Sequence, residues 1–157
     1  MKNNINLYWI GKEEKDSYFD IEQHYLKLSS RFASVSQKAV INKDILKKQS
    51  SSKNTDEVQK SYTDALSPFI VGNSLTIVLD PRGKEITTEK FASIFEQNPN
   101  INFFIGGAFG FEDSFRKKAD FVLGLSSLTL SHKIAKVVLF EQIFRALSIN
   151  ANHPYHK

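Results

Sequence analysis

The sequence predicts an α/β fold, with a mostly parallel β-sheet that carries helices on both of its faces. The first observation is an alternation along the chain of short apolar runs with longer segments whose apolar residues recur every three or four positions. The second is size, because 157 residues, 41% of them hydrophobic and 24% charged, suffice for one domain with its own core. Strands that alternate with helices pair in parallel, and the helices then cover the sheet on both sides. We therefore expect a single domain over residues 1–157.

The chain opens with a predicted strand and a predicted helix. Residues 5–10 form an apolar run that Gly11 ends, as is typical of a strand. Residues 14–30 carry apolar side chains at spacings of three and four, which predicts a helix with one apolar face. The side chains expected on that face are Tyr18, Ile21, Tyr25 and Leu28.

A long polar stretch follows the second predicted strand. That strand is expected over residues 38–41, and residues 42–60 are then rich in Lys, Ser, Asn and Gln. Within this stretch we expect a mobile loop at residues 49–54, because clusters of small polar residues favour loops. A helix is predicted over residues 55–67.

The second half of the chain repeats the pattern and contains the expected ligand site. Strands are predicted over residues 75–79, 101–105 and 121–125, and helices over residues 88–97, 112–119 and 132–147. In open parallel sheets, ligands bind beyond the carboxyl ends of the strands. The segments in that position are a turn at residues 80–83, a glycine loop at 106–110 and a Ser-rich loop at 126–131.

The glycine loop leaves two interpretations open. Gly106, Gly107 and Gly110 lack side chains that would keep a cofactor away from the backbone. A tight turn between strand and helix explains the same residues, and for an isolated glycine pair we favour the turn. A dinucleotide site after the first strand is excluded, because the G-x-G-x-x-G pattern is missing there and only Gly11 is present.

The helix predicted over residues 132–147 is apolar on more than one side. Its apolar residues are Ile134, Val137, Val138, Leu139, Phe140, Ile143, Phe144 and Leu147. A stripe this wide needs cover on a second face. Either the helix lies in the centre of the monomer or it packs against another subunit, and in so small a domain we favour the subunit, which predicts a homodimer.

Composition excludes several kinds of chemistry. The chain has no cysteine, which removes cysteine nucleophiles, thiolate metal sites and thiol redox reactions. Its four histidines lie in no ligand set with carboxylates or cysteines, so we expect no metal. No apolar run reaches the ~18 residues of a membrane span. We therefore expect no membrane contact and a cytoplasmic location.

The charge balance permits a nucleic-acid partner without requiring one. The chain has 21 basic and 17 acidic residues, a formal net charge of +4, and no dense basic block. Contact with RNA would therefore depend on folded geometry or on several copies of the chain. The C-terminal residues 152–157 combine aromatic, imidazole and cationic groups, which suits base stacking and phosphate contact.

Several segments resemble the RlmH family in order and spacing. They are Leu79–Lys84 (LDPRGK), Ile105–Gly110 (IGGAFG), Leu125–His132 (LSSLTLSH), Glu141–Ala146 (EQIFRA) and His153–His156 (HPYH). The chain length and the first strand agree as well, so the resemblance covers essentially the whole chain. Members of this family are SPOUT-class methyltransferases that use S-adenosyl-L-methionine to methylate N3 of a pseudouridine in bacterial 23S rRNA.

The resemblance implies a fold, a cofactor, a partner and a set of site residues. It implies a C-terminal deep trefoil knot, a homodimer, S-adenosyl-L-methionine as cofactor and 23S rRNA, in the ribosome or the large subunit, as substrate. The cofactor contacts that it implies are Leu79, Gly106, Leu125, Ser126, Ser127, Leu128, Thr129 and Leu130. It also implies catalytic or substrate-positioning roles for Arg145, Tyr155 and His156. His156 is the first candidate for the base that removes the N3 proton, and water is an equal alternative.

The sequence departs from the family pattern at a few positions. Ser131 stands where proline is common, Leu128 where methionine is frequent and Gly124 where serine is common, while Phe109 is bulky within the glycine loop. None of these removes a backbone contact in the predicted pocket. The alternatives are an RNA-binding module without catalysis, a SPOUT methyltransferase that acts on another RNA such as tRNA, and a flavodoxin-like regulator.

Overall fold

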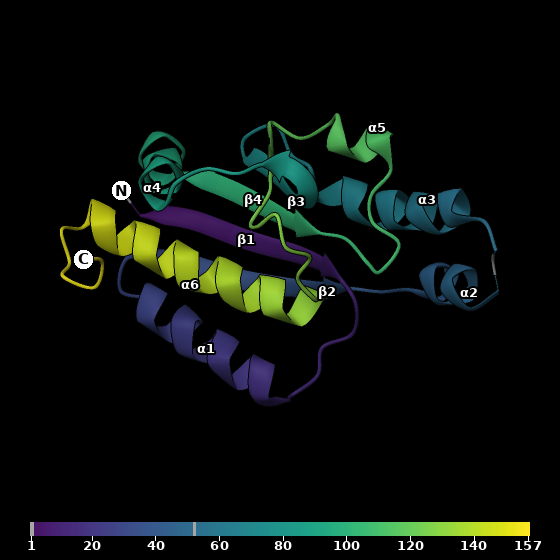
Figure 1. Ribbon diagram of the computed structural model, residues 1–157, viewed down its shortest axis with the longest axis horizontal. Coiled ribbons are helices and arrows are strands. Elements are labelled where there is room, and N and C mark those ends of the chain that lie inside the picture. Colours follow the sequence, from purple (N-terminus) through teal and green to yellow (C-terminus); the bar gives the residue numbers. More distant parts are fainter. Residues whose placement is uncertain (1, 52) are drawn as a thin grey trace.

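The computed structural model describes residues 2–51 and 53–157, which fold around one five-stranded sheet whose strands all pair in parallel. The strands are β1 (Asn3–Ile10), β2 (Ala33–Val40), β3 (Leu75–Lys84), β4 (Asn100–Ile105) and β5 (Phe121–Leu123). Their order across the sheet is β2-β1-β4-β3-β5 (Figure 1). The helices are α1 (Ser17–Ser29), α2 (Lys43–Ser51), α3 (Thr55–Leu66), α4 (Thr88–Gln97), α5 (Asp113–Arg116) and α6 (His132–Asn150), with a short 3₁₀ turn at Ser67–Phe69. The predicted fold class is confirmed.

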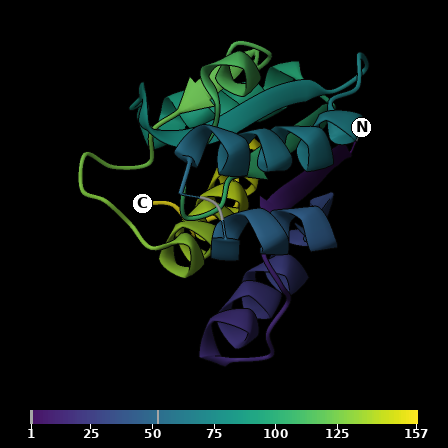
Figure 2. The same cartoon turned by 90° about the vertical axis from the view of Figure 1, so that its right-hand side faces the viewer.

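Helices cover both faces of the sheet. Successive side chains of a strand point to opposite faces, so that Ile77 and Val78 of β3 belong to two different cores. The core containing Ile77 is closed by α1, α4 and α6, and the core containing Val78 by α2, α3 and α5. Figures 1 and 2 show the sheet between these two layers.

Helix α6 lies between α1 and α4 on one face of the sheet (Figure 1). Phe140, Ile143 and Leu147 of α6 are less than 5% exposed within this single chain. The chain's own sheet and helices therefore cover most of its wide apolar stripe, whereas Ile134 near its start is 39% exposed. The helix therefore lies in the centre of the monomer, and the homodimer remains a prediction.

Helix α1 buries a charge where an apolar face was predicted. Asp16 caps the helix by accepting a hydrogen bond from the Phe19 amide at 3.0 Å. Ile21, which the spacing placed on the apolar face, is 44% exposed, whereas Glu22 is only 2% exposed. The Glu22 carboxylate pairs with the Lys136 ammonium of α6 at 3.3 Å. The orientation of α1 is thus set by an ion pair with a partner far along the sequence.

A second charge contact holds this pair in the core. The Lys136 ammonium lies 3.5 Å from the centre of the Trp9 ring, a cation–π contact, and the Gln37 amide donates a hydrogen bond to Glu22 at 2.7 Å. Desolvation lowers the pKa of Lys136, while the carboxylate of Glu22 acts to raise it. Buried charges of this kind persist because each is paired and hydrogen-bonded.

Residues 43–51 form a helix where composition indicated a loop. Asn42 starts α2 by accepting a hydrogen bond from the Ile45 amide at 2.8 Å, and Ile45 is completely buried. Residues 49–51 of the expected loop are therefore helical, and Ser52 lies outside the described residues. The polar composition indicated a loop because only one residue of this short helix, Ile45, is buried and anchors it.

The turn predicted after β3 is instead an irregular part of that strand. Leu79 and Lys84 both pair with Leu123 of β5, so residues 80–83 bulge out of the sheet between them. Gly83 packs against the backbone of Leu123 and Gly124, where a Cβ atom would have no room. Other boundaries shift by a few residues: β2 begins at Ala33, β5 ends at Leu123, α5 is a single turn and α6 continues to Asn150.

Candidate functional site

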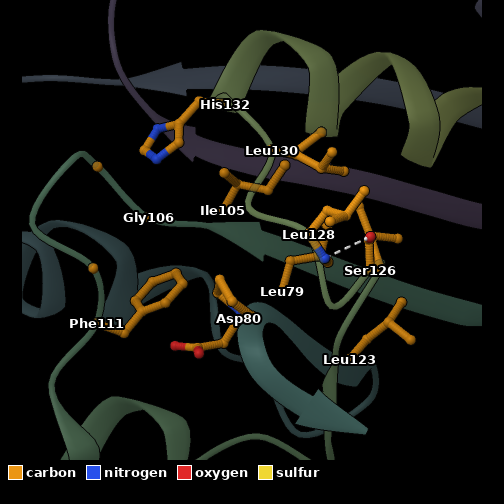
Figure 3. Close-up of a pocket in the computed structure, with 15 residues that line it drawn as sticks. Leu79, Asp80, Ile105, Gly106, Phe111, Leu123, Ser126, Leu128, Leu130 and His132 are labelled. Carbon is orange, nitrogen blue, oxygen red and sulfur yellow. Dashed lines mark hydrogen bonds between the residues drawn. The ribbon is translucent and has the colours of Figure 1, made fainter. Parts of the chain in front are cut away.

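A cleft opens at the carboxyl ends of β3 and β4, where parallel sheets usually bind ligands (Figure 3). Leu79 and Ile105 form the last pair between these two strands, and Leu123 ends the neighbouring β5. All three are less than a tenth exposed and line the cleft. The cleft holds about 610 Å³ of space free of atoms, part of it open to solvent. Its size and apolar wall are typical of a small-molecule site.

The segment from Gly124 to Ser131 forms one side of the cleft. Leu125, Ser126, Leu128 and Leu130 line it, and Leu128 is 76% exposed. The Ser126 hydroxyl accepts a hydrogen bond from the Leu128 amide at 2.9 Å, as Figure 3 shows. This bond holds the segment in a tight bend beside the strand ends.

Ser127 and Thr129 take a different position within the same segment. Both are exposed, and neither side chain is among those that line the cleft. The Ser127 hydroxyl donates a hydrogen bond to Glu85 at 2.7 Å. Six of the eight predicted cofactor residues therefore line one cleft, and the other two lie in the chain between them.

Most backbone amides of this segment have no hydrogen-bond acceptor among the described residues. In the part of the chain that the structure describes, the Leu128 amide is the only one from Leu125 to Leu130 that donates a hydrogen bond within the protein. Backbone amides seek partners, so these donors are available to a ligand. Apolar side chains next to free backbone groups suit a flat heterocycle. Its faces can pack on the side chains, and its polar edge can form hydrogen bonds with the backbone.

The glycine loop is a turn that also lines the cleft. The Gly110 amide donates to the Gly107 carbonyl at 3.0 Å, and Gly110 has a left-handed backbone with φ of 77°. Gly107 lies against the Tyr62 ring of α3, which leaves no space for a Cβ atom. Gln59 of α3 donates to the Phe109 carbonyl at 2.8 Å. The turn interpretation is correct, and α3 fixes the position of the turn.

Asp80 is the acidic group in the cleft wall, and it is 6% exposed. It accepts hydrogen bonds from the Arg82 amide at 2.8 Å and the Arg82 Nε at 3.2 Å, and Arg116 Nη1 lies at 3.4 Å. Desolvation acts to raise the pKa of Asp80, but the hydrogen bonds and charges of these two arginines bring it below its usual range. The carboxylate is therefore ionised at neutral pH.

His132 and Phe111 complete the lining, and neither was among the predicted cofactor contacts. His132 is the first residue of α6 and Phe111 directly follows the glycine turn (Figure 3). Desolvation lowers the pKa of His132, so its imidazole is neutral at neutral pH. The position of Phe111, an aromatic residue after a glycine turn at a strand end, is the sequence signal that could have identified it.

A polar cluster gathers at the opposite end of α6. Arg145 donates to Glu141 Oε1 from Nε at 2.9 Å and from Nη2 at 2.6 Å. Its guanidinium lies 4.7 Å from the centre of the Tyr155 ring, and the Tyr155 hydroxyl donates to Glu141 at 3.2 Å. The hydrogen bond to Glu141 raises the pKa of Arg145, and desolvation raises the pKa of Tyr155 to about 12.

His156 joins this cluster through both of its ring nitrogens. Arg145 Nη1 lies 3.2 Å from Nδ1, and Glu89 of α4 lies 3.2 Å from Nε2. Because guanidinium groups only donate, Nδ1 accepts and a neutral ring carries its proton on Nε2. The structure thus brings the three predicted catalytic residues together.

The cluster and the cleft lie far apart in one chain. Arg145 is 13 residues beyond His132 on the same helix, which corresponds to about 20 Å at the α-helical rise. In Figure 1 the C-terminus lies beside the far end of α6 from the strand tips. Within one chain, the predicted catalytic residues therefore do not reach the predicted cofactor site.

Comparison with known proteins gives matches over the whole chain. A family model described as "Predicted SPOUT methyltransferase" matches residues 3–156. The chain belongs to the SPOUT methyltransferase family. Relatives called "Ribosomal RNA large subunit methyltransferase H" include one from Nitratiruptor sp., 45% identical over 98% of both chains, and one from Campylobacter jejuni, 40% identical over 100% of both. The resemblance to the RlmH group of SPOUT methyltransferases is confirmed.

A solved structure has a similar fold at low sequence identity. It is titled "The structure of a probable methylase family protein from Haemophilus influenzae Rd KW20", with a TM-score of 0.56 at 15% identity. The match covers 100% of this chain and 72% of the other. At this identity the match bears on the fold alone.

Two further observations concern metals and membranes. Within residues 2–51 and 53–157, no group of three or more His, Asp or Glu side chains is arranged to hold a metal ion. None of the described helices is both long and apolar enough to cross a membrane.

Proposed function

We propose that the protein transfers a methyl group from S-adenosyl-L-methionine to N3 of a pseudouridine in bacterial 23S rRNA, in the cytoplasm. The observation that carries this proposal is the full-length similarity to relatives called "Ribosomal RNA large subunit methyltransferase H". The similarity spans 98% of the chain or more in these relatives, and so includes both the cleft and the C-terminal cluster.

The cleft fits S-adenosyl-L-methionine. Leu79, Leu125 and Leu130 would pack on the adenine, and the unpaired amides of residues 125–130, those of Ser127 and Thr129 included, would bond its polar edge. The ionised Asp80 and the neutral His132 both suit a ligand with a sulfonium charge. When bound, the cofactor supplies a methyl group that is already activated for transfer.

The remaining work is positioning and the removal of one proton. Methylation at a ring nitrogen needs no covalent adduct with the enzyme, which agrees with a chain that has no cysteine. Arg145 and Tyr155 would orient the pseudouridine, with the arginine charged and the tyrosine protonated. Holding the two reactants in line accounts for most of the rate enhancement in such a reaction.

His156 is the candidate base, but both of its ring nitrogens are engaged. To accept the N3 proton on Nδ1, it must first give up its contact with Arg145, while Nε2 keeps its proton and donates it in a hydrogen bond to Glu89. Water is the alternative acceptor. His156→Gln, compared with the matched tail variant His153→Gln, separates the two. If His156 is the base, only His156→Gln should lower the turnover. If water is the base, both variants should retain the turnover.

A homodimer would bring the two sites together. The ~20 Å between them along α6 is bridged if two copies pack with their α6 helices antiparallel, so that the tail of one copy reaches the cleft of the other. A symmetric pair of this kind has two identical composite sites. We include in the proposal the deep trefoil knot, with residues 124–131 as part of the knotted region.

The test is methyl transfer from isotopically labelled S-adenosyl-L-methionine to ribosomes of a strain that lacks its own enzyme of this group. We expect label at a single pseudouridine of 23S rRNA, located by mass mapping. Label in tRNA instead would assign another RNA substrate, and RNA binding without label would assign a binding module. Failure to bind S-adenosyl-L-methionine at millimolar concentration would contradict the proposal at its first step.

A further inference from the structure

The net positive charge of the chain comes from one short segment. Residues 38–53 hold five of the 21 basic residues and one of the 17 acidic residues, so their charge equals the net charge of +4. The rest of the chain has sixteen basic and sixteen acidic residues and is balanced. The basic residues of the segment are Lys38, Lys43, Lys47, Lys48 and Lys53. A molecule with little net charge thus has one region of uncompensated charge.

Helix α2 presents this charge to solvent. Ile45 is completely buried, and a rotation of about 100° per residue puts Lys43 and Lys47 on the opposite side of the helix. Both lysines are exposed, and Leu46 beside them is 55% exposed. Among the described residues, no carboxylate lies within ion-pair distance of Lys43, Lys47 or Lys48.

The inner side of α2 packs on α3, whose Tyr62 supports the wall of the cleft. Ile45 belongs to the same core as Phe111, which lines the cleft. The Tyr62 hydroxyl donates to Gln49 of α2 at 2.5 Å, and the Tyr62 ring supports Gly107 of the glycine turn. Figure 1 places α2 at the end of the molecule toward which the strands point, as it does the start of α6. The charged face is therefore held in a fixed position relative to the cleft.

We infer that the outer face of α2, formed by Lys43 and Lys47 with Lys48 at its flank, binds the phosphate backbone of the RNA substrate near the target nucleotide. This inference rests on the proposed function for the identity of the substrate. Phosphates carry one negative charge per nucleotide, and lysines bind them as point charges. These lysines have no internal ion pair to break first, and Leu46 offers apolar contact to a ribose or base.

The experiment measures binding to purified large ribosomal subunits at several salt concentrations. For Lys43→Gln/Lys47→Gln we expect affinity to fall about tenfold at low salt and the slope of log affinity against log salt to decrease by about 1.5, since each phosphate contact accounts for ~0.7–0.9. The matched control is Lys2→Gln/Lys27→Gln, which removes the same charge from exposed lysines away from α2. The control and Lys43→Arg/Lys47→Arg should keep the wild-type slope, and cofactor affinity should not change in any variant.

The outcomes separate this inference from the proposed reaction. Equal binding by the α2 variant and the Lys2/Lys27 control would overturn the inference, even if methyl transfer is normal. A slope that drops only in the α2 variant, in a protein that transfers no methyl, would support the surface and refute the reaction. Binding that depends on α2 with anionic vesicles but not with ribosomal subunits would also overturn the inference, as would a change of oligomeric state alone.

Discussion

The two ends of α6 differ in how their polar groups are used. At the cleft, the amides of residues 125–130 are largely unpaired, and the walls are apolar. At the tail, Arg145 contacts both Tyr155 and His156, and each of the three side chains is hydrogen-bonded to Glu141 or Glu89. The cleft can therefore accept a ligand as it stands, whereas the tail groups must exchange partners to act on a substrate. The comparison indicates that cofactor binding and catalysis can be separated by mutation.

Deletion of Tyr155–Lys157 is the strongest way to separate the two ends. We expect methyl transfer to fall by about 10²–10⁴-fold, the range for loss of positioning and proton transfer. Calorimetric titration should show unchanged affinity for S-adenosyl-L-methionine, because the residues that line the cleft lie between Leu79 and Ala135 and the tail is not among them. Deletion of Lys157 alone serves as the control. Unchanged turnover in the longer deletion would show that the tail has no role.

Lys136→Met should instead lower the stability of the whole fold and so affect both ends of α6, because Lys136 anchors α6 to α1 and β1. It leaves the Glu22 carboxylate buried without its partner, which typically costs about 3–5 kcal/mol. Urea denaturation should show this loss. The double variant Glu22→Gln/Lys136→Met should recover most of the stability, and a double variant as unstable as the single one would contradict the importance of the pair.

Gly106→Ala should weaken cofactor binding in the cleft and leave the contacts of the tail residues unchanged. The added methyl group would lie 3.2 Å from the Phe111 ring and occupy part of the cleft. We expect the dissociation constant for S-adenosyl-L-methionine to rise about tenfold, or about 1.4 kcal/mol, with unchanged turnover at saturating cofactor. Gly72→Ala is the matched control, because nothing lies within 4 Å of its added methyl group. Equal affinities in the two variants would place the ligand elsewhere.

The smallest effect concerns the pH dependence of cofactor binding. His132 has a lowered pKa, so it is neutral at neutral pH and gains a proton only below its ordinary value of 6.5. A proton there places a positive charge beside a cationic ligand, so affinity should fall a few-fold as the pH drops through that lowered pKa. Calorimetry as a function of pH measures this. His132→Gln should flatten the profile, and an unchanged profile would show that another group titrates.

Local patterns were enough to predict the fold, because alternating short strands and longer helices indicate a parallel sheet. The cleft residues came from the resemblance to a known family, and six of those eight residues line one cavity. Local patterns alone gave only the position of the cleft, beyond the carboxyl ends of the strands.

The errors came from partners that are distant in sequence. Ile21 was expected on the buried face of α1, but Glu22 is buried there instead because it forms an ion pair with Lys136 of α6. A helix at Lys43–Ser51 was missed because a single buried residue, Ile45, holds it. The central position of α6 between α1 and α4 could not be predicted either, because the spacing within α6 does not show which helices lie beside it.

The unbroken length of α6 has a consequence for how the chain can vary. Its 19 residues run without a loop from His132, which lines the cleft, to the start of the C-terminal tail. Inserting one residue would turn everything beyond it by about 100° and advance it by about 1.5 Å, so that Arg145 would face a different direction relative to His132. A helix in this role fixes both the distance between the two sites and their relative orientation. Its length should tolerate no gain or loss of residues, whereas the connection between α2 and α3, which carries no site residue, should tolerate both.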